Sequence, residues 1–404
     1  MDPKEVYTAL LMNTDRLHEY MKKYQLDALI ASTPENVMYT SGYWSLGQWT
    51  LLGTHVFVIL SQDNVRKPCL IAPMGELDML LDSPTIWVED IVPYSRFPMF
   101  VSEPLTESDR QLIQLRSKKN IPASGIEALI QVLKERDLDT CKLGVDDGYI
   151  SPQVFYQIRE CLPKTEIMES YNLFRDIRLV KTKEEIKRLK KAAEIDERAI
   201  SAALDSAKLG TTEEQLTIEF NKNIVEQGAK PEFSVICFGN RSAYPNALPT
   251  KKKLQKGDVI RFDVGCIYKF YQSDLARMGA LESVTDKHKK YYEAILKGER
   301  KGIEDLQPGV KASEIFHTIV ETVKKSGLSE FRRHHCGHGI GIEGYDPPLI
   351  SPNDHTELAE GMVLCIEPPY YEIGFAGLQV EDMVVVTKKG ADLLSTLNRE
   401  IRII

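Results

Sequence analysis

Residues 259–277 read VIRFDVGCIYKFYQSDLAR, an apolar, strand-like segment that contains Asp263 and, 11 residues later, Asp274. Side chains alternate between the two faces of a strand, so Arg261 and Asp263 are expected to share one face while the neighbouring apolar residues pack on the other. The 11-residue step suits two adjacent strands joined by a tight connection. The segment therefore predicts an antiparallel strand pair that carries one carboxylate on each strand.

Two later segments also place ionisable residues in apolar or glycine-rich surroundings. Residues 334–348 read HHCGHGIGIEGYDPP and set His338 between glycines, which permit close backbone approach beside a site. Residues 362–386 read MVLCIEPPYYEIGFAGLQVEDMVVV and place Glu367 and Glu381 14 residues apart, which suits a second, slightly longer hairpin. An unpaired buried carboxylate is costly, so several such residues together indicate a bound cation.

Four carboxylates and one imidazole form the predicted metal site. Its ligands are Asp263, Asp274, His338, Glu367 and Glu381. Oxygen ligands with a single imidazole suit Mn, Fe, Co or Zn, and a carboxylate-rich set can bridge two ions about 3.5–4 Å apart. We therefore expect two divalent metal ions, with Mn preferred and Co, Zn or Fe as alternatives.

Composition is that of an ordinary soluble globular protein. The 404 residues are 43% hydrophobic and 27% charged, and no apolar run reaches the roughly 20 residues that span a bilayer. Residues 1–24 carry charges throughout and predict an amphipathic helix without a signal-peptide core, so we expect a cytoplasmic protein with no membrane association. The formal charge of −8 provides no basic field for nucleic acid. The seven scattered cysteines are expected to be free, buried thiols.

The chain is expected to divide near residue 175. Residues 1–175 alternate apolar runs with helical patterns, which is typical of an α/β domain with a largely covered sheet. Residues 176–404 open with a long helix, at whose start Thr182 and Glu185 form a predicted capping box. Helices then precede antiparallel strands twice, which indicates an α+β domain made of two duplicated halves.

The quoted segments resemble the pita-bread metallopeptidase family, which includes prolidase, aminopeptidase P, methionine aminopeptidase and the metal-free creatinase. The match consists of FDVG with SDLAR, CGHGIG, GMVLCIEPPYY and GLQVED, in the family's order and approximate spacing. The resemblance implies a creatinase/prolidase-like N-terminal α/β domain over residues 1–175 and a pita-bread catalytic domain over residues 176–404. It also implies a homodimer in which the N-terminal domain closes over a neighbour's site.

The same resemblance implies a two-metal hydrolase that acts on a peptide or amide bond, in the manner of Xaa-Pro dipeptidases and aminopeptidases. A metal-bridging hydroxide would attack the scissile carbonyl, and Glu367 would accept and relay a proton. His334 resembles an accessory histidine that would assist proton movement or steady a ligand. Tyr371 matches a family tyrosine and is expected to contact the substrate.

Three positions depart from the peptidase pattern, and all are expected to line the substrate site. Asn246 replaces a substrate-facing histidine and cannot shuttle protons near neutral pH. Tyr345 replaces a second histidine, although a phenol can still act in catalysis by donating a hydrogen bond to an oxyanion. Gln379 replaces an arginine, so a positive partner for a carboxylate in or near the site is expected to be missing. The metal site is thus retained while substrate handling has changed.

Several alternatives remain open at this point. The altered positions are compatible with a non-peptide amide, another C–N substrate or lyase chemistry, and this fold also occurs in non-catalytic interaction modules. His334 and His335 follow a basic run and would suit the surface. Asn246 and Tyr345 would also suit purely structural hydrogen bonds.

Overall fold

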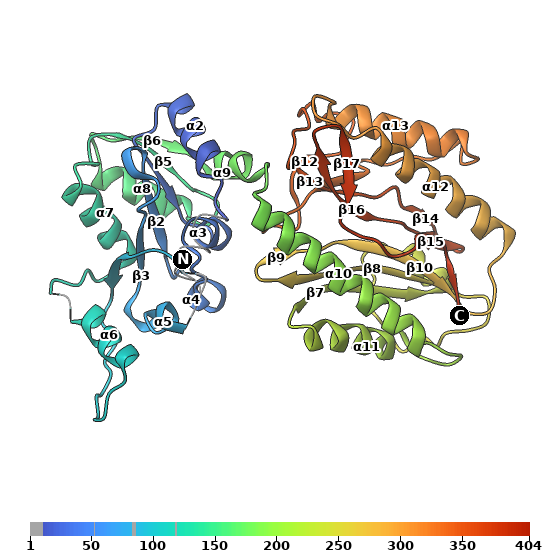
Figure 1. Cartoon of the computed structure of the whole chain (residues 1–404), viewed down its shortest axis with the longest axis horizontal. Coiled ribbons are helices and arrows are strands. Elements are labelled where there is room, and N and C mark those ends of the chain that lie inside the picture. Colours follow the sequence, from blue (N-terminus) through green and yellow to red (C-terminus); the bar gives the residue numbers. More distant parts are fainter. Residues whose placement is uncertain (1–10, 52, 83–85, 118) are drawn as a thin grey trace. The chain divides into compact units, whose positions relative to one another are not determined.

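The computed structural model describes residues 11–404, except residues 52, 83–85 and 118. The chain forms two compact units, Met1–Arg178 and Leu179–Ile404 (Figure 1). The helix predicted over residues 1–24 is present from Thr14 to Tyr24 as α2. Residues 11–13 are not helical, Asn13 being the N-cap, and residues 1–10 lie outside the described residues. Within the part of the chain that is described, no helix combines the length and apolarity needed to cross a membrane.

The N-terminal unit is built around a six-stranded mixed sheet with the strand order β4-β3-β2-β1-β5-β6. Its central strands are apolar and buried except at the last residue of β2 and of β3, as expected for a sheet that is covered on both faces. The predicted α/β architecture of this unit is confirmed. The strands are β1 (Ala28–Ala31), β2 (Phe57–Ser61), β3 (Cys69–Pro73), β4 (Asp90–Tyr94), β5 (Lys142–Val145) and β6 (Glu166–Glu169). The helices after α2 are α3 (Pro34–Ser41), α4 (Leu46–Thr50), α5 (Met79–Asp82), α6 (Glu107–Arg116), α7 (Gly125–Glu135), α8 (Pro152–Cys161) and α9 (Tyr171–Arg178).

The first half of the C-terminal unit begins with the predicted capping box. The Thr182 hydroxyl accepts from the Glu185 amide at 3.3 Å, and the Glu185 carboxylate accepts from the Thr182 amide at 2.7 Å. Two helices follow and pack against a sheet that is antiparallel except for one short edge strand, as Figure 1 shows. The helices are α10 (Lys183–Ser206) and α11 (Glu213–Glu226). The strands are β7 (Lys230–Phe238), β8 (Val259–Tyr268), β9 (Tyr271–Gln272), β10 (Leu275–Ala280) and, from the C-terminus, β18 (Arg402–Ile403).

The second half repeats this order of two helices followed by antiparallel strands, so the predicted duplicated α+β arrangement is confirmed. Its sheet has the strand order β12-β11-β13-β16-β17, and a small hairpin, β14-β15, is inserted between β13 and β16. The helices are α12 (Asp286–Glu304) and α13 (Ala312–Lys325). The strands are β11 (Gly337–Gly339), β12 (Asp346–Leu349), β13 (Val363–Ile366), β14 (Tyr370–Glu372), β15 (Ala376–Leu378), β16 (Asp382–Thr387) and β17 (Gly390–Leu393).

The two sheets of this unit meet at an isolated antiparallel bridge between Ala276 and Glu381. The Glu381 amide donates to the Ala276 carbonyl at 3.2 Å. Arg277 secures the junction, because its guanidinium donates to the carbonyls of Ala276 and Glu381 and to the Asp382 carboxylate, at 2.9, 2.7 and 2.6 Å. Burial alone would raise the pKa of Asp382, but Arg277 and then Arg399 outweigh it and hold that pKa below its usual range. A buried ion pair therefore fixes the backbone on which Glu381 is mounted.

Replacement of Arg277 by Met is expected to lower the free energy of unfolding of the C-terminal unit by about 3–5 kcal/mol, because it leaves a buried carboxylate with a weakened counter-charge. The measurement is urea denaturation followed by far-ultraviolet circular dichroism. Arg300→Met is the matched control, since Arg300 and Glu400 form an ion pair whose side chains are 47% and 57% exposed. That control is expected to change stability by less than about 1 kcal/mol. Equal losses in the two variants would contradict the structural role of the buried pair.

Candidate active site

The carboxylates of Asp263, Asp274 and Glu381 converge at the junction of the two sheets. Asp263 lies within β8 directly opposite Ala276 of β10, and Asp274 comes immediately before β10. The Ala276–Glu381 bridge then brings Glu381 against the same strand. One carboxylate oxygen from each of these acids lies within 4.8 Å of the others. Strand pairing thus brings acids from distant parts of the sequence to one point.

His338 joins this group from β11. Its Nε2 lies 3.5 Å from Asp274 Oδ2 and 3.9 Å from Glu381 Oε1. Its Nδ1 lies 2.9 Å from the carbonyl oxygen of Gly339, a contact that favours a proton on Nδ1 and leaves Nε2 as the ligand atom. The imidazole is therefore oriented toward the carboxylates by the backbone beside it.

The glycines around His338 are required by close backbone contacts. A Cβ added to Gly337 would lie 2.1 Å from the carbonyl oxygen of Cys365, and one added to Gly339 would lie 2.2 Å from that of Pro347. Gly337 also has a φ of +139°, which side chains rarely adopt. These contacts explain why the sequence places glycine on both sides of the histidine.

Glu367 follows β13 and has a polar neighbour at each carboxylate oxygen. Its Oε1 lies 3.5 Å from His335 Nδ1, and its Oε2 accepts from Gln379 Nε2 at 3.4 Å. Burial is the main cause that raises its pKa to about 8, with His338 opposing this rise and Asp274 adding to it. The carboxyl is therefore buried with other acids nearby and only weak polar contacts of its own.

The electrostatics of the site fit a bound cation. Burial also raises the pKa of Asp263 to about 6, and burial together with Asp274 and Glu367 raises that of Glu381 well above its ordinary value. Asp274 Oδ1, His338 Nε2 and Glu381 Oε1 are buried and have no hydrogen-bond partner in the described structure. Converging polar atoms without partners are expensive unless a metal ion satisfies them. The donor set therefore suits divalent ions with a preference for oxygen and imidazole ligands.

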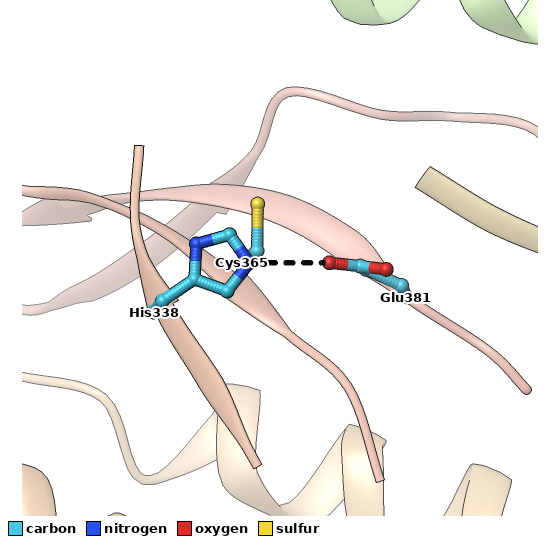
Figure 2. Close-up of side chains that lie close together, drawn as sticks. All are labelled: His338, Cys365 and Glu381. Atoms are coloured by element: carbon cyan, nitrogen blue, oxygen red, sulfur yellow. Dashed lines mark ion pairs between the residues drawn. The ribbon is translucent and has the colours of Figure 1, made fainter. Parts of the chain in front are cut away.

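Cys365 lies beside this set, as Figure 2 shows together with His338 and Glu381. Its thiol is buried, and burial followed by the effects of Glu381 and Asp274 raises its pKa well above the ordinary value. The thiol donates to the backbone carbonyl of Asp274 at 3.8 Å, a contact that fits a packing role for Cys365 beside the ligands. The seven cysteines are all free, but the expectation of burial fails for Cys161, which is exposed, and is met only in part for Cys141, which is half-buried.

Arg261 is a site residue that sequence reasoning missed. Its side chain is completely buried, and its Nη1 donates to Asp263 Oδ2 at 3.2 Å, Tyr371 Oη at 3.1 Å and Gln379 Oε1 at 2.8 Å. Its Nη2 donates to two backbone carbonyls, those of Tyr244 and Pro245. The expectation that Gln379 leaves the site without a positive partner is therefore wrong, because Arg261 brings that charge from the neighbouring strand. The alternation of side chains along β8, which predicts that Arg261 and Asp263 share one face, could have identified Arg261 as a site residue.

The other predicted substrate residues are placed as follows. Tyr371 donates its hydroxyl to Gln379 Oε1 at 3.1 Å, and Gln379 is buried between Arg261 and Glu367. Tyr345 is 53% exposed and stacks on His338 with ring centroids 3.7 Å apart. Asn246 is exposed and directly follows the two carbonyls that Arg261 holds.

Two adjacent histidines occupy different environments. His335 is buried beside Glu367, and burial lowers its pKa to about 3, so it is neutral at physiological pH. His334 is exposed and lies edge-on to His335, with ring centroids 4.3 Å apart. The histidine that faces the carboxylates is therefore His335, and His334 is the outer member of the pair.

Comparison with known proteins agrees with this architecture. Residues 187–388 match the family model described as metallopeptidase family M24, and residues 14–180 match that of the creatinase/prolidase N-terminal domain. An Xaa-Pro dipeptidase from Pyrococcus furiosus is 28% identical over 389 residues, which cover 96% of this chain and 98% of the relative.

Solved structures give the same result. A prolidase from Pyrococcus horikoshii has a TM-score of 0.76 and 26% identity, and the match covers 96% of this chain and 99% of that one. An X-Pro aminopeptidase from Thermotoga maritima, 22% identical, shares the fold with a TM-score of 0.78 over 96% of this chain and 100% of that one. Because the peptidase model matches half of the chain, the protein belongs to metallopeptidase family M24 and is a metal-dependent peptidase with a creatinase/prolidase-type N-terminal domain.

Proposed function

We propose that this protein is an Xaa-Pro dipeptidase that hydrolyses the bond preceding proline with the aid of two divalent metal ions. The observation that carries the proposal is the convergence of Asp263, Asp274 and Glu381 within 4.8 Å, with His338 beside them. Relatives named Xaa-Pro dipeptidase, aligned along nearly the whole chain, support the substrate class. A cytoplasmic homodimer, which the family resemblance implies, is part of the same proposal.

The metal pair would be held by Asp263, Asp274, His338, Glu367 and Glu381. Two divalent ions, when bound, polarise a carbonyl and lower the pKa of a water molecule by several units. Mn is the preferred ion for this oxygen-rich set, with Co, Zn or Fe as alternatives.

The remaining site residues would handle protons and the substrate. Glu367 would accept a proton from the attacking water, since burial raises its pKa and Gln379 contacts one of its oxygens. Burial, followed by the effects of Glu367 and Glu381, raises the pKa of the Tyr345 phenol, which keeps its proton and can donate to an oxyanion. His334 would exchange protons between His335 and solvent. Asn246 and Tyr371 would contact the substrate.

Replacement of Asp274 by Asn is expected to reduce kcat on L-alanyl-L-proline by at least about 100-fold and to lower metal content, because one anionic ligand of the ion pair is lost. Steady-state kinetics and elemental analysis of the purified protein measure the two effects. Asp286→Asn is the matched control, since the Asp286 side chain is fully exposed on α12. Full activity and full metal content in Asp274→Asn would overturn the assignment.

The metal-free protein is expected to lose stability as pH rises from about 5.5 to 8.5. The pKa values of Asp263 and Glu367 are raised to about 6 and about 8, so over this range the folded chain binds more protons than the unfolded chain. The stabilisation is complete below the ordinary carboxyl pKa and is lost as pH passes the raised values. A divalent ion displaces these protons, so its stabilising effect is expected to grow over the same range.

Thermal unfolding in EDTA and in excess Mn²⁺, at several pH values, checks both trends. Glu367→Gln is the control, because it removes one titrating group and should flatten the pH dependence without metal. A melting temperature in EDTA that rises with pH would contradict the prediction.

Replacement of Arg261 by Met is expected to weaken metal binding by about 10- to 100-fold, because Asp263 loses the cation that orients it. Isothermal titration with Mn²⁺ measures the affinity. The double variant Arg261→Gln with Gln379→Arg returns the positive charge from the segment between β15 and β16 and is expected to recover part of the loss. Arg241→Met is the matched control, since Arg241 pairs with the buried Glu213 and has no contact with the metal ligands among its described contacts. Equal affinities in Arg261→Met and Arg241→Met would contradict the role of Arg261.

A further inference from the structure

Arg333 is a cation at the active site for which the described part of the chain provides no carboxylate partner. Its guanidinium carbon lies 5.6 Å from the ring centroid of Tyr371, and its Nε is buried with no hydrogen-bond partner among the described residues. The hydroxyl of Tyr371 donates to Gln379, and Gln379 Nε2 donates to Glu367, so the ring beside Arg333 belongs to the network around the catalytic carboxylate. Arg332, the preceding residue, is exposed and pairs with Glu330 at 3.4 Å.

Arg261 differs from Arg333 in that both of its terminal nitrogens are engaged by the protein, although the Nε of each is buried without a hydrogen-bond partner among the described residues. The Arg261 side chain is fully buried, and its two terminal nitrogens donate to side chains and carbonyls of the protein itself. Arg333 is half-buried, so part of its side chain faces solvent. Of these two arginines near Tyr371, only Arg333 is available to a molecule that enters the site.

Tyr371 provides a fixed support for Arg333. Its hydroxyl accepts from Arg261 and donates to Gln379, each at 3.1 Å, so both ends of the tyrosine side chain are held. A guanidinium that lies near an aromatic ring keeps its hydrogen-bonding edge free for a planar anion. Arg333 is thus oriented without the use of its donors.

The charge of the loaded site indicates the chemistry of the partner. Two divalent ions would neutralise the four carboxylates, and Arg261 and Arg333 would then leave positive charge in excess. An anionic group on the substrate would balance that excess, and a carboxylate matches the bidentate geometry of a guanidinium.

We propose that Arg333 binds the C-terminal carboxylate of the substrate and thereby selects dipeptides over longer chains and amides. The inference rests on the proposed Xaa-Pro dipeptidase function and adds the residue that would set its specificity. In a longer peptide the residue after proline would replace the carboxylate with a neutral amide, which cannot pair with Arg333.

The test compares L-alanyl-L-proline with L-alanyl-L-prolinamide, which differ only in the terminal charge. Replacement of Arg333 by Met is expected to raise KM for the acid by about 10- to 100-fold and to leave KM for the amide within about twofold. Arg333→Lys retains a point charge and is expected to recover part of the loss. Arg332→Met is the matched control and is expected to behave as wild type. Equal changes for acid and amide, or none for either, would overturn the proposal.

A binding measurement separates this proposal from the proposed function. Isothermal titration of the Mn-loaded protein with L-proline and with L-prolinamide is expected to show tighter binding of the acid in wild type and loss of that preference in Arg333→Met. If wild type hydrolyses neither compound, the dipeptidase function fails, while this preference still decides the role of Arg333. If wild type does not distinguish acid from amide in either assay, the role of Arg333 is wrong even where hydrolysis is observed. Melting temperatures and metal contents equal to wild type confirm that each variant is folded and loaded.

Discussion

Mutual repulsion between buried carboxylates is the constraint on which the C-terminal unit depends. Asp263, Asp274 and Glu381 each place an oxygen within 4.8 Å of the others, with Glu367 close by. Such a group is tolerated only where positive charge is supplied or protons are retained. Arg261 supplies positive charge directly to the Asp263 carboxylate. Arg277 acts indirectly, because it donates to the backbone carbonyl of Glu381 and thereby fixes the position of that residue. The raised carboxyl pKa values of Asp263, Glu367 and Glu381 indicate that these cations do not satisfy the whole group.

Local patterns in the sequence predicted a large part of this arrangement. The alternation in β8 put Arg261 and Asp263 on one face, and the capping box fixed the start of α10. The acids and the histidine could be identified because an ionisable side chain in an apolar segment needs a partner of opposite charge or a hydrogen bond. Five such residues in three segments together indicate a bound metal ion. Their grouping within one unit followed from the order of helices and strands.

Contacts between distant segments could not be predicted in the same way. Arg261 and Gln379 are 118 residues apart, and only the bridge between the two sheets shows that the guanidinium of one reaches the amide of the other. The choice between His334 and His335 depends on how β11 enters its sheet, which is set by the close approach of Gly337 to Cys365. Gln379 taken alone therefore indicates that the site lacks a positive charge. In the folded chain Arg261 of β8 supplies that charge and donates to Gln379.

The bridge between Ala276 and Glu381 has a consequence for assembly. Two of the acids belong to the first sheet, and His338, Glu367 and Glu381 belong to the second, so neither half of the duplicated unit contains all five of the proposed metal ligands. Docking of the halves and completion of the metal site are thus one event, and ions that bind the docked state favour it by mass action. Metal occupancy accordingly reports on correct folding of this unit as well as on readiness for catalysis.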